Sequence, residues 1–586
     1  STLCAMSLQT IGSVALPEAK SQIPPTTQDA CDEALAVLRD KADTWAALDL
    51  TGRINLLDAI NETTHAIAER WVQAGCAAKK IRRGTPDEAE EWLGGPAVFL
   101  RNIRLLRRSL VEIRDQGAPQ LPGPVSTLPS GQVVAQVFPT DNLDKILFGG
   151  FTAEVWMDPE LKKEELRDSM AVFYREAKPE GRVGLVLGAG NVSSIGPMDA
   201  LYKLFAEGEV VILKMNPVNE YLGPIMEEAL RPLVDAGYLR VVYGGATVGD
   251  YLCRHDHVDS IHITGSDKTH DAIVWGVGEE GQKAKERGEK RNERPITSEL
   301  GNVSPIIVVP GPWNQKELEF QGVNLASSLT NNAGFNCNAT RVIVNHKGWA
   351  QRRGLLDAVR QAFIQAEDRF PYYPGAKERQ AQFVAAHPEA DQFGAMGEGR
   401  VPWTLIEGLD ANAEDEICFN TEAWCGVTSE AVIEASDVVE YIEKAVEFAN
   451  ERCWGTLSAS IIVHPKSLKD PRVQRAVDKA IEDLRFGSVI VNHWAALSYG
   501  FVSTCWGAFP GHTDEDIRSG RGVVHNTYLF DRPQKTVVRG PFTVFPKPAW
   551  FVTNKTAHEI GRKLTSLYYD GSLLRVPSLL FSALRG

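Results

Sequence analysis

The sequence has few of the features that mark secreted, metal-binding or membrane proteins. Its nine cysteines are an odd number for a chain of 586 residues, and no two have C-x-x-C spacing, so neither a disulfide framework nor a zinc ribbon is expected. No uninterrupted apolar stretch reaches the roughly 18 residues of a membrane-spanning helix. Residues 1–20 also lack the basic start and apolar run of a secretory signal. These absences favour a reducing, cytoplasmic location.

Positive charge is also scarce. The chain carries 62 Lys and Arg against 76 Asp and Glu, a formal net charge of −14 at pH 7. Because binding to nucleic acid needs clustered positive charge, we expect no nucleic-acid partner. Hydrophobic residues make up 43% and charged residues 24% of the chain, which is typical of globular proteins and excludes a largely disordered chain.

The residue pattern divides the chain into five segments. Residues 1–130 are mainly helical in pattern, because apolar residues recur at helical spacing from Trp45 to Val72 and again in 97–113. A Pro- and Gly-rich stretch, 117–131, then leads to the strand-like run VVAQVF at 133–138. We place the segment boundaries at 1–130, 131–180, 181–301, 302–515 and 516–586.

Strands and helices alternate from about residue 181 onward. Five β-branched runs separated by helical segments are typical of a parallel sheet buried on both faces. These runs cover 183–187, 209–214, 239–243, 258–264 and 304–309. A second series of runs covers 341–345, 459–465 and 487–492, with helices around 350–366 and 436–450. The pattern predicts an α/β fold with a Rossmann-like parallel-sheet cofactor domain in 181–301 and a second α/β domain in 302–515.

Glycines and polar residues follow the strands of the first α/β unit. Ligands bind at the carboxyl ends of parallel strands, where glycines admit a ligand to the backbone and helix N-termini donate N–H groups to phosphate. The residues at these positions are Gly188, Asn191, Lys214, Gly245, Gly249, Thr264, Gly265 and Ser266. Singly, each has a structural explanation as a turn or solvated residue, and the G-x-G-x-x-G fingerprint is missing. Together they suggest a dinucleotide site.

Three later segments carry a resemblance to a known family. They are Ser298 to Gly301 (SELG), Asn332 to Cys337 (NAGFNC) followed by Ala339 to Arg341 (ATR), and Glu422 to Trp424 (EAW). Glu299 and Cys337 are 38 residues apart, and the Thr-Gly-Ser at 264–266 lies upstream. In this order the segments resemble the aldehyde dehydrogenase superfamily, over residues 45–530.

The resemblance implies a role for each motif. Cys337 would be the nucleophile that attacks the aldehyde, and Glu299 the base that activates water to hydrolyse the resulting thioester. The side-chain amide of Asn191 and the Cys337 backbone N–H would stabilise the oxyanion. The expected cofactor-binding residues are Gly188, Lys214, Gly245, Gly249, Thr264, Gly265, Ser266, Leu300, Glu422 and Trp424.

The cofactor that the resemblance implies is NAD or NADP. Relatives that prefer NAD often carry Glu three residues beyond the lysine that corresponds to Lys214, whereas this chain has Pro217. Without that carboxylate a 2′-phosphate meets no repulsion, so Pro217 permits NADP. The chain also departs from the family by carrying Ala189 and Gly190 in place of the Pro-Trp usual before Asn191, and Asn302 in place of a glycine.

Structural explanations are preferred for the other reactive side chains. Cys425 and Cys453 have no neighbouring base in the sequence and are expected in the core. His255 and His257 lack further partners at metal-ligand spacing, so no metal site is expected. The charged stretch 279–295 is expected to be a solvated helix or loop; the alternative is that its Lys and Arg approach the adenine end of the cofactor.

Two segments exceed the family pattern, 140–178 and the tail 531–586. Relatives use mid-chain and C-terminal strands for dimer pairing. We therefore expect a small β oligomerisation element and a homodimer or homotetramer, with coverage of the substrate entrance as the alternative role of these segments. A tail that rests on a membrane is a minority alternative, because the last apolar run is short and carries two arginines.

The leading hypothesis is an NAD(P)-dependent aldehyde dehydrogenase that oxidises an apolar aldehyde to a carboxylic acid. The apolar substrate is suggested by the aromatic residues near the motifs, Phe335, Trp424, Trp494 and Trp506. Two alternatives stay open. Coenzyme A could open the thioester, although Glu299 favours water, or the chain could be a non-catalytic assembly protein that retains the fold.

Overall fold

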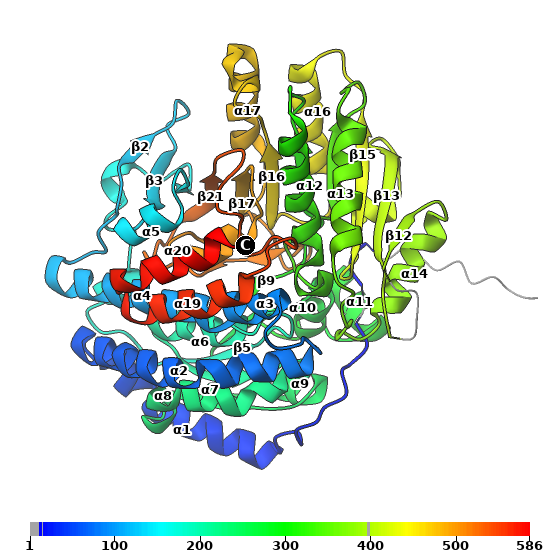
Figure 1. Ribbon diagram of the computed structural model, residues 1–586. Helices are drawn as coiled ribbons and strands as arrows, with labels where there is room; N and C mark the ends of the chain where they lie inside the picture. Colours follow the sequence, from blue (N-terminus) through cyan, green and yellow to red (C-terminus); the bar gives the residue numbers. More distant parts are fainter. Residues whose placement is uncertain (1–10, 15, 395–398) are drawn as a thin grey trace, which may run out of the picture.

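Two sheets organise the molecule. The computed structural model describes residues 11–14, 16–394 and 399–586. Within them a six-stranded sheet and an eleven-stranded sheet are the two large sheets. Figure 1 shows the smaller sheet and its helices in the lower half of the molecule and the larger sheet above them.

The smaller sheet holds five parallel strands in the order β9-β8-β5-β6-β7, and a short antiparallel strand, β19 (Gly520–Arg521), extends it beside β9. The parallel strands are β5 (Val183–Leu187), β6 (Val210–Lys214), β7 (Leu239–Val242), β8 (Ser260–Thr264) and β9 (Ile296–Glu299). The helices between them are α6 (Ile195–Phe205), α7 (Gly223–Ala229), α8 (Arg231–Asp235), α9 (Ala246–Cys253), α10 (Asp267–Val274) and α11 (Gly278–Arg287). The Rossmann-like α/β architecture is therefore confirmed.

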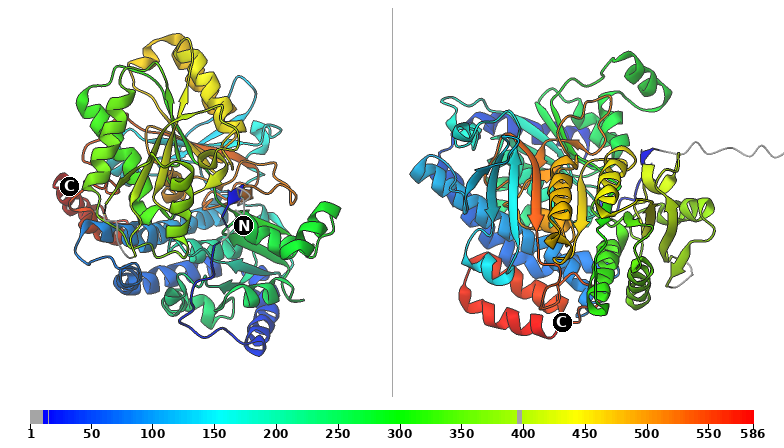
Figure 2. Two further views of the ribbon diagram at one scale, coloured as in Figure 1. Left: turned by 90° about the vertical axis from the view of Figure 1, so that its right-hand side faces the viewer. Right: turned by 90° about the horizontal axis from the view of Figure 1, so that it is seen from above.

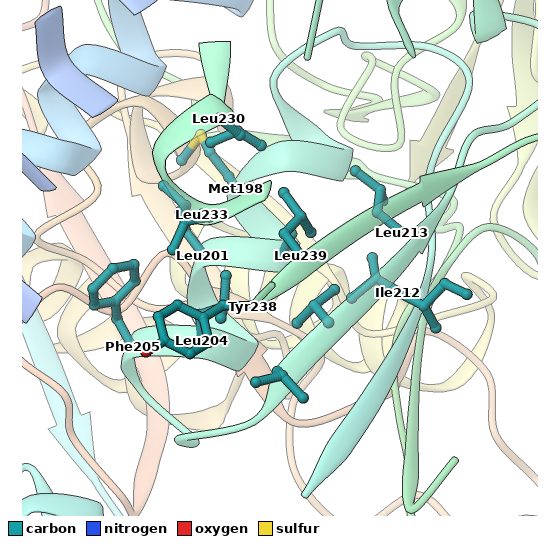
Figure 3. Close-up of a cluster of buried hydrophobic side chains, with 14 of the residues drawn as sticks. Met198, Leu201, Leu204, Phe205, Ile212, Leu213, Leu230, Leu233, Tyr238 and Leu239 are labelled. Carbon is teal, nitrogen blue, oxygen red and sulfur yellow. The ribbon is translucent and has the colours of Figure 1, made fainter. Parts of the chain in front are cut away.

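Apolar residues on both faces explain why these strands read as continuous hydrophobic runs. Every residue of β5, β6 and β8 is buried. Figure 3 shows Leu201, Leu204 and Phe205 of α6 gathered with Ile212 of β6 and Leu239 of β7. The sheet thus buries apolar surface on both faces and leaves only its carboxyl end for a ligand.

The N-terminal segment is helical, as its amphipathic pattern predicts. Its helices are α1 (Gln28–Ala47), α2 (Leu50–Ala78), α3 (Ala89–Trp92) and α4 (Val98–Gln116). Helix α1 packs against the smaller sheet, and α2 packs against α4 and α7. Trp45 of α1 is fully buried, and its indole N–H donates to the Leu204 carbonyl at 3.2 Å. The helical segment therefore shares one hydrophobic core with the smaller sheet.

The larger sheet has seven parallel strands at its centre. They are β10 (Pro305–Val308), β11 (Val342–His346), β13 (Trp403–Asp410), β15 (Val427–Ile433), β16 (Ser458–Ile462), β17 (Ser488–Val491) and β21 (Pro533–Arg539). One edge strand, β12 (Asp391–Phe393), is antiparallel. The flanking helices are α12 (Gln315–Thr330), α13 (Arg352–Gln365), α14 (Ala376–Ala386), α16 (Val438–Glu451) and α17 (Pro471–Asp483).

The other edge of the larger sheet is built from the mid-chain segment. Strands β4 (Thr152–Met157), β3 (Val133–Phe138) and β2 (Val125–Thr127) follow β21 in antiparallel order. The expected small β element is therefore continuous with the larger sheet instead of forming a sheet of its own. The Pro- and Gly-rich stretch 117–131, expected to be a loop, contains β2.

The chain after β21 turns back onto the N-terminal helices. Helix α19 (Ala557–Asp570) packs against α3 and α4, and α20 (Val576–Leu584) packs against α19. Figure 1 shows both as red helices beside α4 and α3, and the right-hand view of Figure 2 shows them along one side of the molecule. The final segment of the chain thus covers residues that lie more than 400 positions earlier.

Short elements complete the described chain. They are β1 (Gly12–Ser13), α5 (Asn142–Leu147), β14 (Thr421–Glu422), α15 (Ile417–Asn420), α18 (Ala496–Gly500), β18 (Trp506–Gly507) and β20 (Val523–Val524). The charged stretch 279–295 is largely helix α11, whose Lys285 pairs with Asp271 at 2.7 Å. No helix in the described ranges is long and apolar enough to cross a membrane.

A buried ion pair on α4 gives a test of this packing. Arg101 makes two bonds to Asp144 of α5, at 2.7 and 3.1 Å, and both side chains are almost fully buried. Arg101→Met should lower the free energy of unfolding by about 3–5 kcal/mol, because it leaves the buried Asp144 carboxylate without its cation. Arg107 on the same helix pairs with Asp58 in solvent, so Arg107→Met should cost at most about 1 kcal/mol. Urea titration followed by circular dichroism measures both, and equal effects would contradict this account.

Candidate active site

The sequence-predicted nucleophile and base come from different sheets and meet in one cavity. Glu299 is the last residue of β9, and Cys337 lies in the loop between α12 and β11. Both side chains, together with Asn191 from the turn after β5, line a cavity of about 490 Å³. The structure therefore brings together the three residues expected to carry the chemistry.

The Cys337 thiol and the Glu299 carboxylate lie near enough to influence each other electrostatically. Glu299 is 4% exposed, and burial raises its pKa to about 8 even though hydrogen bonding from Cys337 and Trp506 opposes the shift. Burial, and then the charge of Glu299, raise the pKa of the Cys337 thiol above its usual range. At neutral pH the pair is therefore mostly protonated, and the basic form of Glu299 grows as the pH passes 8.

The loop that carries Cys337 is held in an unusual conformation. Asn332, Ala333 and Gly334 have φ values of 54°, 56° and 84°. A Cβ at Gly334 would lie 2.6 Å from the Cys425 carbonyl carbon, so only glycine fits there. The buried Arg341 guanidinium joins these two segments by donating to the Gly334 and Cys425 carbonyls at 2.7 and 2.6 Å. Arg341 of the ATR motif thus holds the NAGFNC motif in place.

Asn191 is anchored by its main chain as well as its side chain. Its amide nitrogen donates to the Phe335 carbonyl at 2.9 Å, which uses one of its two hydrogens. Its main-chain carbonyl oxygen accepts hydrogen bonds of 3.1 Å from the side chains of Lys79, Asn332 and Tyr372. Asn191 therefore has one orientation, with an amide hydrogen left for a substrate oxygen.

Lys79 and its partner Glu91 were missed by the sequence reasoning. Their side chains are 5% and 2% exposed and form an ion pair of 2.6 Å at the cavity wall. Lys79 also donates to the Asn332 side-chain oxygen at 2.9 Å. Both residues lie in the N-terminal helical segment, far from every motif, so no local pattern connects them with Asn191.

A second group behind Glu299 was also missed. Thr264 is paired with Glu299 across β8 and β9, and its hydroxyl donates to Asp199 of α6 at 2.8 Å. Asp199 is buried, yet His262 at 3.4 Å and His525 at 3.8 Å lower its pKa to about 2. Its persistent negative charge helps to raise the pKa of Glu299. Thr264, expected to bind cofactor, thus also links Asp199 to the strand that carries the base.

The glycines expected to bind cofactor lie around one lysine. Gly188, Lys214, Gly245 and Gly249 follow β5, β6 and β7, and a Cβ at Gly249 would stand 3.3 Å from Lys214 Cε. Lys214 donates to the Gly244 carbonyl at 2.6 Å, and burial lowers its pKa to about 8. These four residues thus lie together at the carboxyl ends of neighbouring strands.

The remaining expected cofactor residues lie at the neighbouring strand ends. Gly265 follows β8, and the Ser266 hydroxyl caps α10 by accepting from the Thr269 N–H. Leu300 is buried beside Glu299. Glu422 is also buried; its carboxylate accepts from the Asn302 N–H at 3.2 Å, and burial raises its pKa to about 7. The Trp424 indole N–H is buried and has no hydrogen-bond partner among the described residues.

The N-terminal arm, defined as residues 11–14 and 16–26, runs along these same residues. Its Ser13 pairs with Glu422 in the β1–β14 ladder, and the Ser13 N–H donates to Asp267, next to Ser266, at 3.1 Å. Further along the arm, Glu18 accepts from the Ala246 N–H at 2.9 Å. Nothing in the sequence indicates that this segment reaches the expected cofactor site.

Other reactive side chains have structural surroundings. Cys425 and Cys453 are buried, and burial raises the pKa of both thiols. A cluster of His387, Glu416 and Cys418 has metal-ligand spacing, but His387 and the Cys418 backbone N–H already hydrogen-bond the same Glu416 oxygen, at 2.8 and 3.0 Å. Hydrogen bonding accounts for that arrangement.

Residues 147–373 match the family model of the aldehyde dehydrogenase family. Among curated proteins, 4-trimethylaminobutyraldehyde dehydrogenase of Rattus norvegicus is 33% identical over 138 residues, which is 23% of this chain and 25% of that protein. The A form from Danio rerio is 31% identical over 143 residues, or 24% and 25%. The matched segment thus spans about a quarter of the length of these relatives.

Solved structures share the fold over most of the chain. An aldehyde dehydrogenase from Burkholderia cenocepacia, described as putative, has a TM-score of 0.58 at 18% identity, covering 88% of this chain and 93% of that one. An NAD-dependent aldehyde dehydrogenase from Sinorhizobium meliloti has 0.58 at 17%, covering 90% of each. An NADP-dependent glyceraldehyde-3-phosphate dehydrogenase from Bacillus halodurans, complexed with NADP, has 0.57 at 17%, covering 89% and 95%. The solved structures thus share the fold of this chain, and residues 147–373 resemble the aldehyde dehydrogenase family.

Proposed function

We propose that this protein is an NAD(P)-dependent aldehyde dehydrogenase that oxidises an apolar aldehyde to its carboxylic acid. The observation that carries the proposal is that Cys337, Glu299 and Asn191 line one cavity, with Cys337 and Glu299 near enough to influence each other electrostatically. A thiol, a buried base and an amide donor are the three groups needed to form a thioester and hydrolyse it.

In the first step the Cys337 thiol gives up its proton to solvent, and the sulfur forms a bond to the aldehyde carbon. The negative charge moves to the aldehyde oxygen, where the free amide hydrogen of Asn191 and the Cys337 N–H stabilise it. Because the Asn191 carbonyl is held by three donors, the amide needs no reorganisation when this charge develops. Lys79 and Tyr372 act as positioning residues.

The nicotinamide dinucleotide, when bound, supplies the hydride acceptor that the oxidation needs. The residues that would hold it lie at the carboxyl ends of neighbouring strands. They are Lys214, Gly245, Gly249, Ser266 and Glu422. Pro217 places no carboxylate beyond Lys214, so either NAD or NADP is permitted. Structural neighbours include enzymes described as dependent on each.

In the last step Glu299 takes a proton from water, and the hydroxide attacks the thioester carbon. The carbon–sulfur bond breaks, the carboxylic acid leaves, and the Cys337 sulfur regains a proton from Glu299. Water is favoured over coenzyme A as the acceptor because a buried carboxylate lines the same cavity as the sulfur that carries the acyl group. Coenzyme A would need no such base.

The cavity supports an apolar substrate more directly than the sequence does. Of the four aromatic residues that suggested it, Trp494 and Trp506 line the cavity. Phe335 is fully buried and packs against Tyr372 behind the Cys337 loop, so it cannot contact substrate. Trp424 packs with Tyr373 in the same place.

We further infer a homodimer or homotetramer in the cytoplasm. Strand β2 forms an edge of the larger sheet, where it is mostly exposed and carries unpaired backbone groups that a second copy could use. All eight cysteines in the described part of the chain are free thiols, which suits a reducing compartment.

Replacing the base separates the two half-reactions. Glu299→Gln should give a burst of about one reduced cofactor per active site, followed by a steady rate at least about a hundredfold lower, because water then lacks its base. Stopped-flow absorbance of the reduced cofactor measures both phases. Cys337→Ala should abolish the burst, whereas Cys453→Ala, a buried thiol without a base, should leave both phases unchanged. A normal steady rate in Glu299→Gln would contradict the assigned role.

The pH dependence follows from the raised pKa of Glu299. Turnover should rise with pH and reach half its maximum near pH 8, because only the ionised carboxylate accepts a proton. Cys337, Asp199, Trp506 and Glu422 are the groups that influence this pKa. Asp199→Asn removes a negative charge that raises it, so the midpoint of the kcat profile should move to lower pH. A midpoint that stays in place or moves upward would refute the electrostatic role of Asp199.

A further inference from the structure

The cavity that contains Cys337 extends far beyond the reacting groups. Its outer half is walled by the C-terminal cap, which we define as residues 541–586. From the cap, Trp550 and Phe551 of the connecting loop, Ile560 and Leu564 of α19, and Leu579 and Ala583 of α20 all line it. The reactive pair thus opens onto a wall made by the last part of the chain.

Apolar residues outside the cap line the cavity as well. Phe148 is in ring contact with both Phe151 and Phe501, and all three line it. Of the three cations that line the cavity, Lys79 pairs with Glu91 at 2.6 Å and Arg369 with Glu90 at 2.7 Å, whereas Lys547 donates to the Thr553 carbonyl at 3.0 Å. Two of the three charges are thus neutralised within the protein, and the apolar residues of the cap favour hydrocarbon over a charged tail.

The size of the cavity sets the length of the hydrocarbon. If a methylene group needs about the 30 Å³ that a water molecule takes in the liquid, a volume of about 490 Å³ holds roughly sixteen such groups, and about a dozen remain for the chain once the space around Cys337, Glu299 and Asn191 is set aside. Ile146 and Phe545 line the cavity and are 47% and 84% exposed, so they mark where it opens to solvent. A longer chain would emerge there and gain no further contact.

We propose that the substrate is an aliphatic aldehyde of up to about twelve carbons, and that the C-terminal cap is the element that recognises its chain. The inference rests on the proposed function, since it places the aldehyde carbon at Cys337 and runs the chain toward α19 and α20. Each methylene that leaves water for this wall can raise kcat/KM by up to about fourfold, until the chain reaches the opening.

The test compares two substitutions on α20. Ala583 lines the cavity, whereas Leu584 is 58% exposed and is not part of its lining. Wild type, Ala583→Phe and the matched control Leu584→Phe are assayed with the straight-chain aldehydes from propanal to hexadecanal. For wild type and the control, kcat/KM should rise with chain length and level off near dodecanal. Ala583→Phe should lose at least tenfold with dodecanal but stay within twofold with propanal, which also shows that it folds.

Each outcome has one meaning. A flat chain-length profile in the wild type, or a profile that Ala583→Phe leaves unchanged, would overturn the role of the cap while leaving aldehyde oxidation in place. Equal losses with propanal and dodecanal would also overturn it. If the wild type oxidised no aldehyde with either cofactor, the proposed function itself would fail.

A different observation concerns the N-terminal arm and the expected cofactor site. The Glu18 carboxylate sits against Gly245, where an added Cβ would collide with it, and accepts the Ala246 N–H at the start of α9. A helix N-terminus with free N–H groups attracts anions, and Lys214 is near enough for the charge of Glu18 to act on its pKa. At the other end of the arm, Ser13 bonds both Asp267 and Glu422.

The arm therefore bonds Glu422, which the proposed function assigns to a dinucleotide, and the neighbours of two other assigned residues, Ala246 beside Gly245 and Asp267 beside Ser266. The left-hand view of Figure 2 shows its start between the two halves of the molecule. We propose that the arm is an internal competitor of the cofactor, with Glu18 in the place of an anionic group, and that cofactor binding displaces it. This inference rests on the proposed cofactor site and is independent of the substrate.

Direct binding tests the competition without turnover. Isothermal titration of NAD and NADP into wild type, Glu18→Ala and the matched arm control Gln22→Ala should show about tenfold tighter binding to Glu18→Ala alone, since one charge-assisted hydrogen bond no longer opposes the ligand. In wild type, saturating cofactor should also speed tryptic cleavage after Lys20, which is exposed on the arm.

Unchanged or weaker binding to Glu18→Ala would overturn the competition, because the arm would then be a bystander or part of the cofactor site. Protection of Lys20 by the cofactor would overturn it as well. Failure of wild type and Glu18→Ala alike to bind either nucleotide would overturn the proposed cofactor and, with it, this inference.

Discussion

The electrostatic interaction of the Cys337 thiol with the Glu299 carboxylate in one cavity is the interaction on which the rest of the structure depends. It joins the end of a strand in one sheet to a loop that precedes a strand in the other. Both groups are withdrawn from water, and burial raises the pKa of each. Because Glu299 and Cys337 belong to different sheets, the distance between them stays constant only if the two sheets are fixed relative to each other. Packing far from the site therefore affects the chemistry.

Several buried bonds supply that rigidity. Arg341 holds the left-handed run before Cys337 to the chain at Cys425, and Lys79 holds Asn191 from the N-terminal helices. Residues in sparsely populated backbone regions persist only where their surroundings over-determine them, and here two separate cations do so. Asp199 adds an electrostatic constraint, because its charge reaches Glu299 through the adjoining strand. The two ends of the chain then close the site from outside, the cap over the cavity and the arm along the strand ends.

Much of this arrangement could be predicted from sequence, because its determinants are local. Buried parallel strands appear as apolar runs, and β5, β10 and β17 lie within about a residue of the expected positions. The motifs around Glu299 and Cys337 predict which groups meet. Lys79, Asp199 and His525 could not be found in this way, since their roles depend on contacts between segments more than 100 residues apart. The same holds for β2–β4, whose union with the larger sheet depends on β21, and for Glu18, which lies in a segment without any motif.

The central claim is that the acyl group passes through Cys337 and is released by Glu299. Below the pKa of about 8, Glu299 is mostly protonated, so hydrolysis should lag behind acylation. Wild-type protein mixed with dodecanal and NAD at pH 6, quenched with acid within a turnover and analysed by peptide mass spectrometry, tests this directly. The account predicts a dodecanoyl adduct on the peptide that contains Cys337, disappearing after a jump to pH 9. Turnover without an adduct, or with the acyl group on another cysteine, would contradict it.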